Sequence, residues 1–125
     1  MKFIPIFPEL LRKGGWEFDQ LTDRAGTLVL MLVDAGNRRA RLSFDSYFAY
    51  RKLDEGDALL TLVEIGKTGG TGRYFYRVED STFLAWFNQE RCAVSSSTPL
   101  IHYAIAASND IIDVLAMDAP RVDVE

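Results

Sequence analysis

The chain has 125 residues, of which 48% are hydrophobic and 26% charged, and its net charge is −4. This length and composition are typical of one globular domain with a single core, spanning residues 1–125. No apolar run approaches the roughly 20 residues of a membrane helix, and no basic stripe beyond the short run 38–41 could follow a phosphate backbone. We therefore expect a cytoplasmic protein that binds neither membrane nor nucleic acid.

The charge is spread unevenly along the chain. Residues 1–50 carry seven Lys/Arg and six Asp/Glu, giving +1, whereas residues 51–125 carry seven and twelve, giving −5. An acidic C-terminal half favours a protein partner with a basic surface, although the same charge would serve solubility alone. Cys92 is the only cysteine, so no intrachain disulfide can form, and we expect a buried, inert thiol after a helix end.

The first part of the chain is predicted to consist of strands around one hairpin. Prolines make residues 2–7 a short edge strand, because proline removes a ladder donor, and weak alternation over 16–21 indicates a half-buried strand. The continuous apolar run 27–33 is expected to be buried on both faces. It turns through 34–37, where Gly and Asn suit a positive φ, and pairs with 38–44 as a hairpin.

Two later segments have helical periodicity. Apolar residues between 54 and 65 recur at spacings of three and four, and acidic residues lie at the start of this segment, where the helix dipole favours them. Residues 79–91 predict a second helix capped by Asp80 or Ser81. Its apolar stripe comprises Phe83, Trp86 and Phe87. Strand patterns occupy 45–51, 73–78, 100–108 and 111–117, the last two as a second hairpin.

Strands therefore dominate, with helices set between them. The pattern predicts an α+β fold, a mostly antiparallel sheet of five to seven strands with two or three helices packed on one face. Residues 118–125 are expected to form a loose tail beyond the last strand.

The segment 66–73, GKTGGTGR, has the composition of a phosphate-binding loop. The Walker pattern requires a glycine at position 61, which is Thr. Such a loop also leaves a strand and opens a helix, whereas here a helical pattern precedes the segment and a strand pattern follows it. We expect this segment to be a mildly basic loop that connects a helix to a strand and binds no nucleotide.

Four polar residues lie among apolar strand residues: Asp45, Arg51, His102 and Asp113. One interpretation is a polar pocket that holds a ligand. The favoured interpretation is structural, with Asp113 outward or paired with Arg51 or Arg77, and with His102 bonded to backbone or facing solvent. Nucleophile-elbow and metal-ligand spacings are missing, so we expect neither catalysis, metal nor cofactor.

Tyrosine is common in interface hot spots, and the interface candidates are Tyr47, Tyr74, Tyr76 and Asp110. The segments beginning FDSYFAYRKLD, YFYRVEDSTF and LIHYAIAASND, within residues 44–117, resemble a family of small uncharacterised bacterial proteins. That resemblance implies no activity. In size and charge alone the chain also resembles the immunity proteins of polymorphic toxin systems, a likeness that transfers no residue.

These observations predict a binding protein without catalytic activity, with an immunity protein that neutralises a partner toxin as the specific hypothesis. The alternative is a small enzyme or ligand-binding domain whose pocket lies near Asp45, Arg51, His102 and Asp113. A third hypothesis is a homodimer in which an edge strand pairs with its twin.

Overall fold

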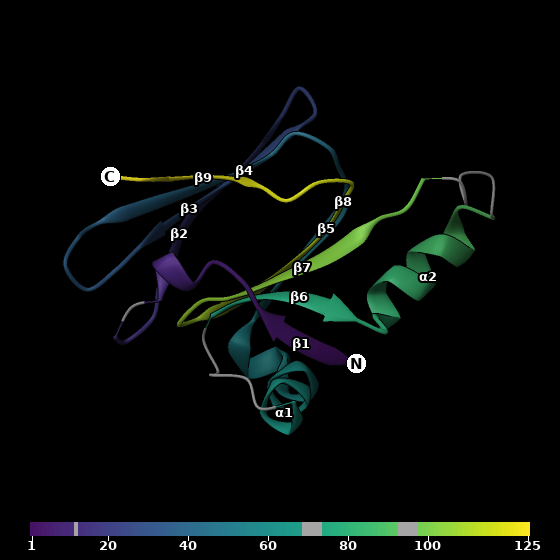
Figure 1. Ribbon diagram of the computed structural model, residues 1–125, viewed down its shortest axis with the longest axis horizontal. Coiled ribbons are helices and arrows are strands. Elements are labelled where there is room, and N and C mark those ends of the chain that lie inside the picture. Colours follow the sequence, from purple (N-terminus) through teal and green to yellow (C-terminus); the bar gives the residue numbers. More distant parts are fainter. Residues whose placement is uncertain (12, 69–73, 93–97) are drawn as a thin grey trace.

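The computed structural model describes residues 1–11, 13–68, 74–92 and 98–125. Within them the chain forms two antiparallel sheets and two α-helices, which confirms an α+β fold (Figure 1). The strands are β1 (Lys2–Pro5), β2 (Glu17–Arg24), β3 (Thr27–Val33), β4 (Arg39–Phe44), β5 (Tyr47–Asp54), β6 (Phe75–Glu79), β7 (Ile101–Ala106), β8 (Asp110–Ala116) and β9 (Arg121–Val124). The helices are α1 (Leu59–Lys67) and α2 (Thr82–Glu90), with 3₁₀ turns at Pro8–Leu10 and Glu55–Asp57.

The expectation of one sheet is wrong, because the strands divide between two. One sheet has the order β1-β6-β7-β8-β5 and the other the order β2-β3-β4-β9. The four-stranded sheet packs on one face of the five-stranded sheet, and both helices lie on the opposite side (Figure 1). The molecule therefore has three layers, and the five-stranded sheet is the middle one.

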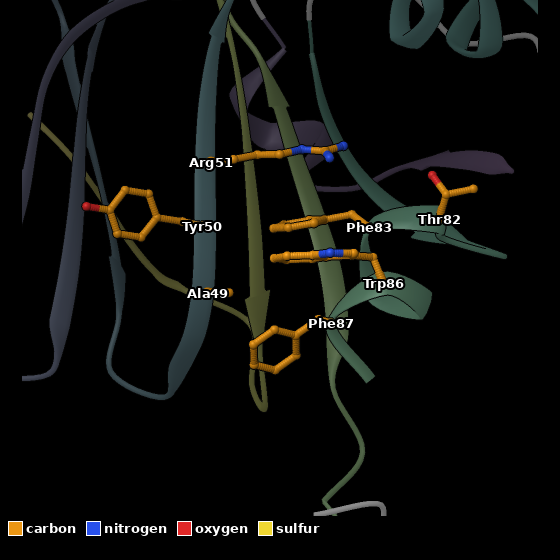
Figure 2. Close-up of a pocket in the computed structure, with 7 residues that line it drawn as sticks. All are labelled: Ala49, Tyr50, Arg51, Thr82, Phe83, Trp86 and Phe87. Atoms are coloured by element: carbon orange, nitrogen blue, oxygen red, sulfur yellow. The ribbon is translucent and has the colours of Figure 1, made fainter. Parts of the chain in front are cut away.

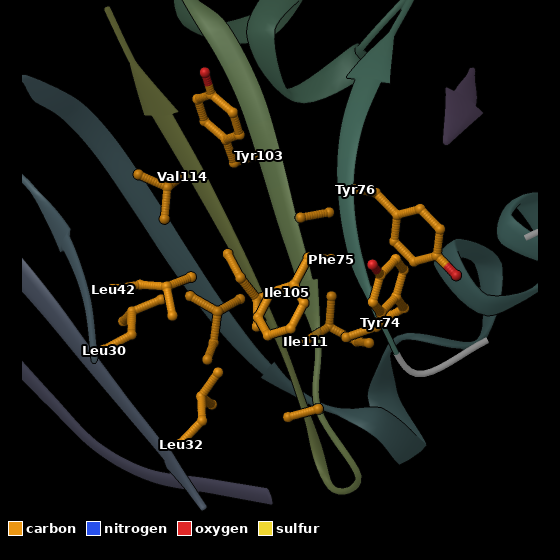
Figure 3. Close-up of a cluster of buried hydrophobic side chains, with 14 of the residues drawn as sticks. Leu30, Leu32, Leu42, Tyr74, Phe75, Tyr76, Tyr103, Ile105, Ile111 and Val114 are labelled. Atoms are coloured by element: carbon orange, nitrogen blue, oxygen red, sulfur yellow. The ribbon is translucent and has the colours of Figure 1, made fainter. Parts of the chain in front are cut away.

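The main core lies between the two sheets. Leu30 and Leu42 are directly opposite each other on β3 and β4, and they face Ile105 and Val114 of the middle sheet (Figure 3). Along β3, buried side chains alternate with half-buried ones. The prediction that residues 27–33 are buried on both faces is thus wrong, because the described residues form a partner layer on only one face of this sheet.

The hairpin from β3 into β4 is confirmed. Its register places Leu28 opposite Phe44 and Leu32 opposite Ala40. In the turn, Asn37 adopts a φ of 64°, as expected for Asn in a left-handed position. The Asp34 carboxylate accepts hydrogen bonds from the backbone N–H groups of Gly36 and Arg38, which fixes the turn.

The expected loose tail over residues 118–125 is wrong, because Arg121–Val124 form β9 and pair with β4. Leu42 lies opposite Val122, whose side chain packs against the core. The alternation of polar residues with Val122 and Val124 is the period-two signal of a strand. It spans only four residues, too few to stand out in the sequence.

Both predicted helices are present, but α1 begins later than the pattern indicated. Asp54 caps the preceding 3₁₀ turn by accepting from the N–H of Gly56 at 2.8 Å. Gly66 falls inside the last turn of α1 rather than beyond it. No helix of the described residues is long and apolar enough to cross a membrane.

α2 begins where predicted, since the Ser81 hydroxyl accepts from the N–H of Leu84 at 2.9 Å. At the other end of this helix Cys92 has a φ of 51° and is exposed, so the expectation of a buried thiol is wrong.

Candidate functional site

A hollow of about 470 Å³ opens between helix α2 and strand β5 (Figure 2). This volume lies within the range of small-ligand sites. The described residues that line the hollow are Ala49, Tyr50, Arg51, Thr82, Phe83, Trp86 and Phe87. Arg51 is the one charged residue among these seven, so the lining is mainly apolar with a single cation.

Planar groups lie in layers along one wall of the hollow (Figure 2). The Arg51 guanidinium carbon lies 4.2 Å from the centre of the Phe83 ring. The rings of Phe83 and Trp86 are 6.0 Å apart between centroids and nearly parallel, at 12°. Trp86 is 52% exposed, which is unusual for so large an apolar surface. The wall therefore presents a cation followed by two stacked rings.

The aromatic row continues past the hollow toward the C-terminal end of α2. Phe87 is tilted against Trp86, and the exposed Phe48 meets Phe87 edge to face. The Arg91 guanidinium lies 5.1 Å from the Phe87 ring centre and 5.7 Å from that of Phe48. An arginine thus flanks each end of the row, Arg51 at one end and Arg91 at the other.

A chain of hydrogen bonds runs behind the hollow. Ser81 Oγ lies 2.6 Å from His102 Nδ1, and His102 Nε2 lies 2.6 Å from Asp113 Oδ1. The second oxygen of Asp113 accepts from Arg51 Nε at 2.9 Å. These residues come from the cap of α2 and from strands β7, β8 and β5. Sheet register brings them together, because Asp113 is directly opposite Arg51 on one side and Ala104, two residues from His102, on the other.

The charge on Asp113 is stabilised by its neighbours. Burial acts to raise the pKa of Asp113, but the hydrogen bonds and charges of His102 and Arg51 outweigh it and lower that pKa below its ordinary value. An ionised carboxylate only accepts, so Nε2 of His102 carries a proton toward it. The Ser81 hydroxyl shares a hydrogen bond with Nδ1 and accepts from Leu84, so both ring nitrogens have a partner.

The grouping of serine, histidine and aspartate has the composition of a hydrolase triad, but its surroundings differ. Ser81 and His102 are buried, and neither is among the described residues that line the hollow. The Ser81 oxygen is also committed to capping α2. A nucleophile must reach its substrate. The hydrogen bonds through Ser81, His102 and Asp113 therefore hold Arg51 and α2 in place, and the Ser81 oxygen is not positioned to attack a ligand.

Three of the four predicted site residues are therefore brought together, and Asp45 is not. Of the two outcomes expected for Asp113, outward-facing or paired with an arginine, the second is present, and the partner is Arg51. His102 bonds to side chains instead of backbone or solvent, contrary to the favoured interpretation. Asp45 lies on the surface, bonded to Arg121 at 2.9 Å, and this bond lowers the pKa of Asp45.

The predicted interface residues lie mostly in the interior. Tyr76 is fully buried, and Tyr74 and Asp110 are nearly so. Tyr47 is half-buried, with its hydroxyl bonded to Asp23. Both faces of the middle sheet are covered, by the other sheet and by the helices, and this burial takes the aromatic rings of β6 away from any surface.

Sequence reasoning missed the roles of two residues. Ser81 was expected only as a cap, and its bond to His102 joins residues 21 positions apart, which no local pattern reveals. Trp86 was assigned to the apolar stripe of α2. A helix of nine residues with one face toward the sheet has little room to bury three large rings. That excess of aromatic surface is the signal that could have indicated an exposed ring.

Comparison with protein families, curated proteins and solved structures finds no match to this chain. Among the described residues, no cluster of three or more His, Cys, Asp or Glu side chains is arranged to hold a metal ion. Residues 69–73 of the glycine-rich segment lie outside the described residues, and its first part, Gly66 to Thr68, ends helix α1.

Proposed function

We propose that this chain is a binding module without catalysis, and that its ligand occupies the hollow between α2 and β5 with an anionic group on Arg51. The observation that carries this proposal is the position of the guanidinium. The Arg51 side chain is 42% exposed, and its guanidinium reaches from β5 across the top of the hollow toward α2 and lies over an aromatic ring (Figure 2).

The sign of the ligand charge follows from which side of the Arg51–Asp113 pair faces the hollow. The Asp113 side chain is 2% exposed and both of its oxygens already accept hydrogen bonds. Arg51 uses Nε for this pair, which leaves the two terminal nitrogens at the open end of the fork. Two parallel N–H groups match the oxygens of a carboxylate or phosphate. The hollow therefore favours an anion.

The aromatic layers define the rest of the ligand. A planar or apolar body would cover the exposed surface of Trp86 and gain free energy by removing it from water. Asp113 and Phe83 hold the guanidinium in place before any ligand arrives, so less side-chain entropy is lost on binding. The preferred ligand carries one anionic group on an apolar or aromatic body.

The immunity-protein hypothesis stays a prediction. Its interface tyrosines are largely internal, which favours the pocket hypothesis over a broad tyrosine-rich docking face. The pocket differs from the predicted one in that Arg51 alone of the four residues lines it.

The test compares three probes of one shape: benzoate, benzamide and benzamidine, which are anionic, neutral and cationic. Binding is followed by NMR shifts of the ¹⁵N-labelled protein, with the Trp86 indole N–H as reporter. We expect benzoate to shift the signals of Thr82, Phe83 and Trp86, and benzamidine to leave them unchanged.

Two variants probe the same site, and a third serves as the control. Arg51→Met should weaken benzoate binding about tenfold or more, as loss of a charge-assisted pair requires. Trp86→Ala, at an exposed position, should weaken it without affecting the fold. Arg121→Met, which removes an arginine bonded to a surface carboxylate, should leave it unchanged. Equal binding of benzoate and benzamidine, or full binding to Arg51→Met, would contradict the proposal.

A further inference from the structure

We propose that the natural occupant of the hollow is an extended peptide carrying a carboxylate, which pairs with the free edge of β5 as a sixth strand of the middle sheet. The proposal rests on the proposed function for the carboxylate contact with Arg51. It adds a backbone contact that a small anion does not make.

The hollow reaches the backbone of β5, which is the last strand of its sheet, because three consecutive residues of that strand line it. Ala49, Tyr50 and Arg51 all line it, although successive side chains of a strand point to opposite faces. The Tyr50 ring points away from α2 (Figure 2). Its contribution to the lining therefore comes from the backbone of β5.

That edge is unpaired in the described structure. β5 is the last strand of its sheet and pairs on one side only, with β8. It spans eight residues, long for an edge strand. A row of free backbone N–H and C=O groups of this length is a template for an added strand.

Helix α2 supplies the opposite wall. It packs its Phe83 ring against His102 of β7, two strands from β5, and it meets β5 through Arg51 and Phe48. A peptide strand beside β5 would point alternate side chains toward α2, where Phe83, Trp86 and Phe87 form an apolar surface. Main-chain bonds would then give affinity and the aromatic row specificity.

Charge favours a foreign peptide over a second copy of this chain. β5 carries Arg51 and Lys52 in sequence, and their partners Asp113 and Asp110 both lie on β8, on the inner side of the strand. Cations on an edge strand discourage self-pairing, because two copies would bring like charges together. On the face toward the hollow, Arg51 complements a peptide that carries a carboxylate.

The test begins with selection from two phage libraries of random octapeptides, one displayed with a free carboxyl terminus and one displayed internally. Each is selected in parallel on the wild type and on Arg51→Met and Trp86→Ala. We expect peptides enriched on the wild type and lost on both variants. Enrichment from the first library assigns the carboxylate to the chain terminus, and enrichment of Asp or Glu in the second assigns it to a side chain.

The backbone contact is tested with synthetic enriched peptides that are N-methylated at one position at a time. An added strand uses the N–H groups of one edge only. Methylation at alternate residues should therefore weaken binding about tenfold or more, and methylation at the residues between should change it by about twofold or less. Amide exchange of residues 49–51 should slow when the peptide binds.

Failure of the peptide proposal is separable from failure of the proposed function. If benzoate binds but no peptide is enriched, or if methylation at every position is tolerated, the hollow takes small anions and the added strand is wrong. If the free protein is a dimer with protected amides at 49–51, a second copy occupies the edge, and the peptide proposal is also wrong.

Discussion

Asp113 is the residue on which the site geometry depends. Its two oxygens hold side chains from the strands on either side of it, Arg51 from β5 and His102 from β7. Removing one partner of a buried charged pair leaves the others unsatisfied, which costs more than the pair contributed. The carboxylate therefore matters both to stability and to the direction of the guanidinium.

Asp113→Asn should destabilise the protein by about 2–4 kcal/mol, toward the lower end for buried ion pairs because Arg51 is partly exposed and keeps access to water. It should also weaken benzoate binding, since the guanidinium loses its support. Urea unfolding at pH 7 measures the first effect. Asp45→Asn is the matched control, because its carboxylate bonds to Arg121 on the surface, and its midpoint should stay near that of the wild type. Equal midpoints for the two variants would contradict this role.

The same carboxylate predicts a pH dependence. Its pKa is lowered in the folded state from an ordinary value of 3.8, so the unfolded chain takes up this proton at a higher pH than the folded one. The stabilisation is then complete above about pH 6 and is lost as the pH falls below 3.8 and through the folded pKa. The difference in unfolding free energy between wild type and Asp113→Asn should be constant near neutrality and shrink at acid pH. A difference that grows on acidification would have the wrong sign.

The pairing of Asp113 could be anticipated from the sequence, whereas the bond between Ser81 and His102 could not. A carboxylate beside Ile112, Val114 and Leu115 must either face outward or be paired, so the partnership of Asp113 with an arginine was one of two predicted outcomes. The choice of Arg51 over Arg77 depends on which strand lies beside β8, and that is a property of the sheet order. The bond from Ser81 to His102 depends further on where α2 crosses the sheet.

Among the elements, α2 has two roles: its N-cap Ser81 joins the buried hydrogen bonds, and its aromatic side chains form a wall of the hollow. Ser81 accepts from Leu84 and bonds His102, so one hydroxyl fixes the start of the helix and the imidazole together. Ser81→Ala should cost about 2 kcal/mol, half from the lost cap and half from the unpaired imidazole nitrogen.

The neighbouring substitution Thr82→Ala provides the comparison for Ser81→Ala, since Thr82 is exposed and alanine favours helix. In thermal unfolding, the midpoint temperature of Thr82→Ala should equal or exceed that of the wild type, and the midpoint of Ser81→Ala should lie below it. A Ser81→Ala protein as stable as Thr82→Ala would mean that the hydroxyl supports neither the helix nor His102.

Helix α1 is attached to the molecule by a small part of its surface. Ile65 is its fully buried residue, whereas Leu59, Leu60 and Val63 are exposed. Ile65→Ala should therefore cost about 2–4 kcal/mol through the cavity it leaves, and Leu60→Lys should change stability by about 0.5 kcal/mol or less. Chemical unfolding of both variants measures this contrast. A large loss for Leu60→Lys, with a change in sedimentation, would show that another molecule covers this face.

For the whole molecule, element types were predictable and layers were not. The helices, the hairpin of β3 and β4, and the strands β7 and β8 follow from local periodicity, which records which faces of an element are buried. Periodicity does not record what buries them. An apolar run such as 27–33 therefore has the same pattern in a central strand as in a strand whose outer face is only half-buried. For the same reason the pattern does not distinguish one sheet from two stacked sheets.

The C-terminal strand shows how the layers depend on a short segment, and it yields the last prediction. β9 covers the outer edge of β4 through four residue pairs and brings Val122 against the core. Deleting residues 120–125 would expose that edge and part of the apolar layer beneath it, including Leu42. The truncated protein should unfold at a lower urea concentration and associate more readily, since a free edge pairs with other chains. Val122→Ser in the full chain keeps most of the backbone pairing and should show the lower midpoint without the association. A truncated protein with an unchanged midpoint would mean that these residues contribute nothing to the four-stranded sheet.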